Sequence, residues 1–111
     1  MLDTSPLTAA VERFADRLRA APQSRLQQGA AAAALELARE LSARAQALEG
    51  APVREMPDAG MFVVGDQVAV AGLDLVEALR SVRGADATTA PSVMLDEAVR
   101  LVEQAEVRAM R

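Results

Sequence analysis

The chain has 111 residues and a formal net charge of −4, and its apolar content of 51% includes only two aromatic side chains. A single domain of this size is expected to bury roughly 65% of the surface that its unfolded chain exposes. Because Cys and His are absent, the composition excludes disulfides, thiolate or imidazole metal sites and histidine-based catalysis, and the negative charge argues against nucleic-acid binding.

The first segment predicts an amphipathic helix. Ser5 and Pro6 suit an N-cap and a first helical position, and Pro22 is expected to stop the helix. The apolar positions that recur at intervals of three and four residues are Leu7, Ala10, Val11, Phe14, Leu18 and Ala21.

The second predicted helix runs from Ser24 to Glu49, and Gly50 is its expected C-terminal cap. Ser24 and Gln27 fit an S-x-x-Q capping box. A continuous helix over this range would measure about 39 Å, which is long for a domain of this size. Either Gly29 marks a bend or a late start, or a partner chain covers the excess length.

The apolar residues of this helix spread over an unusually wide arc, which implies contact on two sides. One face carries Leu37 and Leu41, the natural core of a single chain. The side formed by Ala31, Leu35 and Ala38 must then find cover elsewhere, and we expect it to form part of an interface with a second subunit.

Residues 61–71, MFVVGDQVAVA, follow a loop with two prolines and two glycines and predict a two-stranded antiparallel hairpin. Gly65 and Asp66 fit a type II′ turn, in which the first central residue has a positive φ. Both faces of this ribbon are apolar, so both need to be covered. We expect the helices of the same chain to cover one face. A second chain should meet the other face or an edge, where two hairpins could join into one sheet. The candidate interface residues in this stretch are Met61, Phe62, Val63, Val68 and Val70.

Two more helices are expected after the hairpin. The first is short, buries Leu75, Val76 and Leu79, and ends before Gly84, and the second begins near Ser92. The predicted fold is therefore mainly helical (α+β): a single domain of residues 1–111, with four helices in α-α-β-β-α-α order around the hairpin.

No motif indicates chemistry. Asp58, Asp66 and Asp74 lie near the expected hairpin and could in principle hold a metal ion, but turns and helix starts explain acidic residues at such positions. Glycine-rich phosphate-binding patterns are absent. We therefore assign no catalytic, metal-binding or cofactor-binding residue.

These observations favour a small non-enzymatic protein that acts by protein–protein interaction, as a homodimeric adaptor or regulatory subunit. The alternative is a small-molecule-binding or sensor domain with an apolar pocket, lined by Met61 and Phe62, between the hairpin and the helices. The N-terminus lacks a basic region followed by a long apolar run, and no segment is apolar over the ~18 residues that span a bilayer. We expect a cytoplasmic protein with no membrane or nucleic-acid partner.

Overall fold

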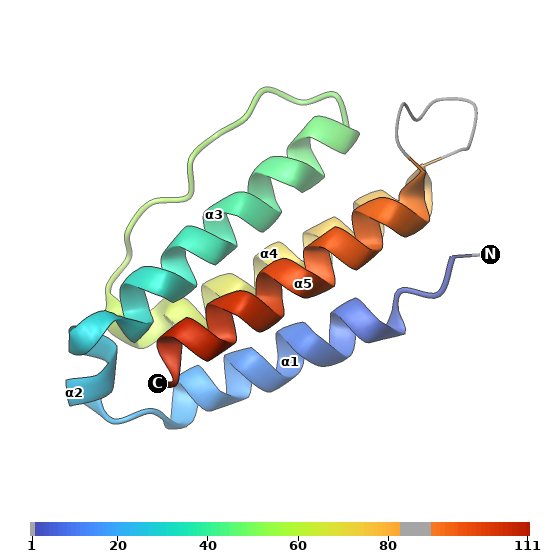
Figure 1. Cartoon of the computed structure of the whole chain (residues 1–111). Coiled ribbons are helices and arrows are strands. Elements are labelled where there is room, and N and C mark those ends of the chain that lie inside the picture. Colours follow the sequence, from blue (N-terminus) through green and yellow to red (C-terminus); the bar gives the residue numbers. More distant parts are fainter. Residues whose placement is uncertain (1, 83–89) are drawn as a thin grey trace.

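The computed structural model describes residues 2–82 and 90–111, which form a bundle of four long helices (Figure 1). These helices are α1 (Ser5–Ala20), α3 (Ala31–Leu48), α4 (Val64–Ser81) and α5 (Pro91–Ala109). Shorter turns are α2 (Gln23–Arg25), η1 (Leu26–Ala30) and η2 (Met61–Val63). The described residues contain no strand.

The bundle has an uncommon connection between its second and third long helices. α1 and α5 run in one direction and α3 and α4 in the other (Figure 1). Each of α1 and α3 packs against both α4 and α5. Because α3 and α4 are parallel neighbours, the chain must return along the whole bundle between them. Residues 49–60, which we call the strap, make this return as an extended segment.

The predicted hairpin at residues 61–71, and with it the α-α-β-β-α-α order, is wrong. These residues form η2 and the first half of α4. The inward positions Val64, Val68, Ala71 and Leu75 recur every three or four residues and continue the pattern of the helix expected further on. Burial along this continuous stripe outweighs the β propensity of the valines, because that propensity depends on context.

Gly65 does not occupy a turn, and its φ is not positive. Gly65 and Gly72 instead face α1 from within α4. A Cβ atom at Gly72 would lie 2.6 Å from Cγ1 of Val11, and one at Gly65 would lie 3.1 Å from the carbonyl oxygen of Ala15. The two glycines therefore allow α1 and α4 to approach closely.

The helix ends follow local sequence signals in part. α1 ends before Pro22, as predicted, and at its start Asp3 Oδ1 accepts the Ser5 N–H at 3.0 Å. Hydrogen bonding from the Ser5 side chain, together with this backbone hydrogen bond, lowers the pKa of Asp3. The predicted capping box is wrong, because Pro22 precedes the helical turn at Gln23 and no side chain caps it.

The second predicted helix is interrupted, and Gly29 marks the bend with a φ of 134°. The expected cap at Gly50 is confirmed. Gly50 has a φ of 71°, its N–H bonds to the Ala47 carbonyl, and the Ala51 N–H bonds to the Gln46 carbonyl at 2.9 Å. This pair of bonds is the Schellman arrangement.

The core lies between all four helices. Its largest fully buried side chains are Leu7, Phe14, Leu41, Val68, Leu75, Leu79 and Val102. Most of the wide apolar arc of α3 is covered within the chain, since α3 packs against both α4 and α5, whereas Ala31 stays partly exposed. Burial of Leu75, Val76 and Leu79 matches the sequence prediction. α4 ends at Ser81, before Gly84 as predicted, while Gly84 itself lies outside the described residues. No helix in the described part of the chain is long and apolar enough to cross a membrane.

Candidate functional site

Three side chains hold the strap over the line along which α3 and α4 pack together. From α3, Arg39 Nε donates to the Met56 carbonyl at 2.8 Å, and Gln46 bonds to both the N–H and the carbonyl of Arg54. From α4, Gln67 Nε2 donates to the Pro57 carbonyl at 2.9 Å. These contacts are hydrogen bonds between side chains and the backbone, and the partly buried side chain of Met56 adds an apolar contact with the core.

Two further features fix the strap. Arg39 also pairs with Glu55 at 3.1 Å, and Asp58 Oδ1 accepts the N–H of Gly60, whose φ is 103°. The Gln67 Oε1 atom beneath the strap is buried without a hydrogen-bond partner in the protein. A buried acceptor without a partner costs about 1 to 3 kcal/mol, which lowers the free energy needed to lift the strap.

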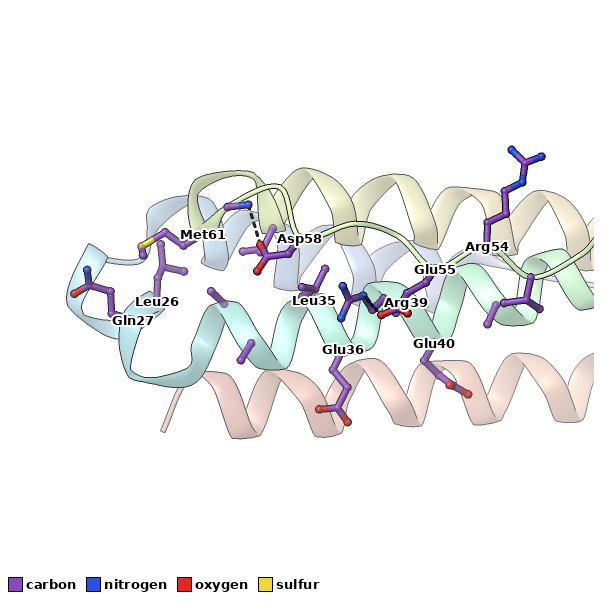
Figure 2. A pocket seen from close by; sticks show the side chains of 16 residues that line it. Leu26, Gln27, Leu35, Glu36, Arg39, Glu40, Arg54, Glu55, Asp58 and Met61 are labelled. Carbon is purple, nitrogen blue, oxygen red and sulfur yellow. Dashed lines mark hydrogen bonds and ion pairs between the residues drawn. The ribbon is translucent and has the colours of Figure 1, made fainter.

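A long open groove of about 1060 Å³ lies between the outer face of α3 and the strap (Figure 2). Its apolar lining combines three alanines with five larger side chains. The apolar lining residues are Leu26, Ala31, Ala32, Leu35, Ala43, Val53, Met61 and Val64. The α3 residues that line it extend from Ala31 to Ala43, which corresponds to about 18 Å of helix.

Charged side chains form two rims along the groove. Glu55 and Asp58 lie on the strap side, whereas Glu36 and Glu40 point to the side of α5 (Figure 2). Glu40 pairs with Arg44 at 2.9 Å. The pKa of Arg44 is raised. Burial by itself would lower this pKa, but hydrogen bonds from Arg44 to Glu40 and Glu97 more than offset the effect of burial.

A second feature is an exposed apolar stripe on the outer side of η2 and α4, which we call the α4 stripe. Its members are Phe62, Val63, Val70 and Leu73. Phe62 is 72% exposed, and Val70 and Leu73 are each 56% exposed. The outer face of α1 instead carries charged residues such as Glu12 and Asp16 at its exposed positions.

The structure divides the sequence-predicted interface residues among three places. Ala38 and Val68 lie in the core. Ala31, Leu35 and Met61 line the groove, and Leu35 is only 9% exposed. The remaining three residues, Phe62, Val63 and Val70, lie in the α4 stripe. Met61 and Phe62 therefore do not share a pocket.

The three aspartates considered as possible metal ligands have separate positions. Asp58 caps Gly60 in the strap, Asp74 is exposed within α4, and Asp66 pairs with Arg19 of α1 at 2.8 Å. The hydrogen bond to Asp66 raises the pKa of Arg19. Within residues 2–82 and 90–111, no group of three or more acidic side chains could hold a metal ion.

Sequence reasoning missed one charged residue in the interior. Glu106 of α5 is 7% exposed and pairs with Arg13 and Arg17 of α1, each at 3.2 Å. Its position between the buried residues Val102 and Ala109, at helical spacing, was the available signal. Arg13 and Arg17 are one turn apart, so a single carboxylate on the facing helix can reach both.

Comparisons with known protein families, with curated proteins and with solved structures found no match to this chain.

Proposed function

We propose that this protein is a non-enzymatic interaction or regulatory protein of the cytoplasm that acts as a homodimer joined through the α4 stripe. The observation that carries the proposal is the group of four apolar side chains exposed on the outer side of η2 and α4. Clustered exposed apolar side chains of this kind are typical of interaction sites, whereas single ones are ordinary.

The position of the stripe supports an interface. α4 already packs against α1 and α3, and Val70 and Leu73 lie on its remaining, outward side together with the exposed charged residues Asp66, Asp74, Glu77 and Arg80. A partner on this side would bury Val70 and Leu73 and would meet the charged residues beside them.

The charges beside the stripe favour a second copy of this chain as the partner. Asp66 and Arg80 are exposed and lie seven residues before and after Leu73. Seven residues are about two helical turns, so these side chains lie on nearly the same side of α4 as Leu73. If two α4 helices cross antiparallel with Leu73 at the two-fold axis, Arg80 of each chain faces Asp66 of the other. Asp66 already pairs with Arg19 of its own chain at 2.8 Å, so Arg80 would be a second cation at this carboxylate.

Size-exclusion chromatography with light scattering tests this proposal. The parent should have twice the mass of one 11.7 kDa chain. Leu73→Asp should give a folded monomer, because the charge would be buried at the interface. Val107→Asp on α5 is the matched control, since Val107 is also 56% exposed, and it should remain dimeric.

Charge reversal tests the arrangement of the two chains. Arg80→Asp should weaken the dimer by placing like charges opposite each other, and adding Asp66→Arg should restore part of the affinity. A parent that has the mass of one chain from micromolar to millimolar concentration would contradict the dimer. A dimer that tolerates Leu73→Asp would contradict its placement on the α4 stripe.

A further inference from the structure

The groove between α3 and the strap is separate from the α4 stripe, and it combines three properties. It has an apolar floor, it is open to solvent along its length, and it has acidic side chains on both rims. Compact pockets for small molecules enclose most of their ligand in ≈ 300–1,000 Å³. A groove of about 1060 Å³ that stays open along α3 is better suited to an elongated ligand.

The charges of the groove are not balanced within the molecule. Of the four carboxylates on its rims, Glu40 and Glu55 have close cationic partners. Asp58 has no cationic partner within 4 Å in the described part of the chain, and Glu36 reaches Arg108 only at 3.9 Å. One acidic side chain on each rim is therefore available to a ligand.

The basic side chains of the groove do not neutralise these two residues. Arg39 is engaged by Glu55 and by the Met56 carbonyl. Arg54 points away from α3 (Figure 2). A ligand that lies along the floor between Asp58 and Glu36 would thus meet negative charge on both sides and apolar surface beneath it.

We infer that this groove binds an amphipathic helix of a partner protein that has an apolar face flanked by Lys or Arg. The small side chains Ala31, Ala32 and Ala43 allow a helix to approach α3 closely. Its apolar face would cover Ala31, Ala32 and Met61, which are partly or fully exposed. Its basic flanks would meet Asp58 and Glu36. This is helix-in-groove recognition with complementary charge.

The chain contains no Trp or Tyr. The fluorescence of a tryptophan placed in a peptide therefore reports directly on binding of that peptide. The probe is a synthetic helical peptide of about 18 residues, with leucines on one face, lysines on both flanks and one tryptophan among the leucines. Its fluorescence should shift to shorter wavelength and saturate when parent protein is added. A peptide with glutamates in place of the lysines, and a scrambled peptide of the same composition, are the ligand controls.

Variants locate the binding site. The double variant Glu36→Gln, Asp58→Asn should weaken binding of the peptide about fivefold, as expected for the loss of two exposed charge contacts. Asn is chosen at position 58 because its side-chain oxygen can still accept the Gly60 N–H. Ala32→Phe should weaken binding about tenfold by filling the floor, and the residue is exposed, so the fold tolerates the change. Glu12→Gln with Asp74→Asn removes the same charge elsewhere and should leave the affinity unchanged.

Several results would overturn the inference. Equal binding of the scrambled or the acidic peptide would show that no specific groove is involved. Loss of binding in Leu73→Asp would place the peptide on the α4 stripe, whereas retained binding in this variant separates the groove from the proposed dimer. Full displacement of the peptide by octylamine at an equal molar concentration would show that the groove binds small hydrophobic amines instead.

Discussion

The two flanks of α4 differ in how they are held. On the α1 side, Gly65 and Gly72 bring two helical backbones together, and Val11 fills the space above Gly72 with no room for another atom. On the other flank, the strap is held by Arg39, Gln46 and Gln67 through hydrogen bonds to its backbone.

This comparison indicates that one helix takes part in two different kinds of contact. Close packing of α1 against α4 depends on shape, so a single added methyl group disturbs it. Hydrogen bonds to the strap can exchange with water at low net cost, so the strap can move without loss of the bundle. The substitutions below test this difference, beginning with the largest expected effect.

Gly72→Ala should destabilise the protein by about 2 kcal/mol, because the new Cβ atom would overlap both methyl groups of Val11 and force α1 away. Chemical denaturation followed by circular dichroism measures this change. Val11→Ala removes the overlapping atoms, so the double variant should be more stable than the sum of the two single changes predicts. Additive effects would show that α1 and α4 do not touch at this point.

Glu106→Gln should destabilise the protein by about 1 kcal/mol, because the shape is kept while the charge that Arg13 and Arg17 share is lost. The two arginines are about half exposed, so water limits the loss. Glu103→Gln, an exposed change one turn earlier in α5, is the control. Equal denaturation midpoints for the two variants would contradict a role for Glu106 in joining α1 to α5.

Arg39→Met should change the free energy of unfolding by less than about 1 kcal/mol. Trypsin should nevertheless cleave the variant after Arg54 several-fold faster than the parent. The reason is that the strap loses the hydrogen bond at Met56 and the ion pair at Glu55. Arg44→Met is the matched control, because Arg44 pairs with Glu40 and Glu97 and does not bond to the strap. If both variants are cleaved at the parent rate, Arg39 does not hold the strap.

Sequence patterns predicted α1, α5, the second half of α4 and the loop at residues 50–60, but not the first half of α4. Pro22 and Gly50 mark helix ends because each acts locally, through a fixed φ or a left-handed conformation. The wide apolar arc of α3 correctly indicated contact on two sides, and neighbouring helices of the same chain supply those contacts.

The hairpin prediction failed because Gly65 and the surrounding valines have two interpretations that local rules cannot separate. Alternating valines and a glycine fit a turn between strands, but the same letters also place Val64, Val68 and Ala71 at helical spacing. Burial along the stripe that continues to Leu75 favours the helix, and this burial depends on packing against residues far away in the sequence, such as Val11 against Gly72. The groove could not be foreseen either, since it depends on the path of the strap over α3.

The most direct test of this account is amide hydrogen exchange measured residue by residue by nuclear magnetic resonance. Val68, Ala71 and Leu75 are buried on the inner side of α4, so their amides should exchange only through global unfolding. The Arg54 amide, bonded to the Gln46 side chain, should exchange at least ~100-fold faster. Similar exchange rates at Val68 and Arg54, or strand-like chemical shifts within residues 61–71, would contradict the account of α4 as a helix packed firmly on α1 beneath a loosely held strap.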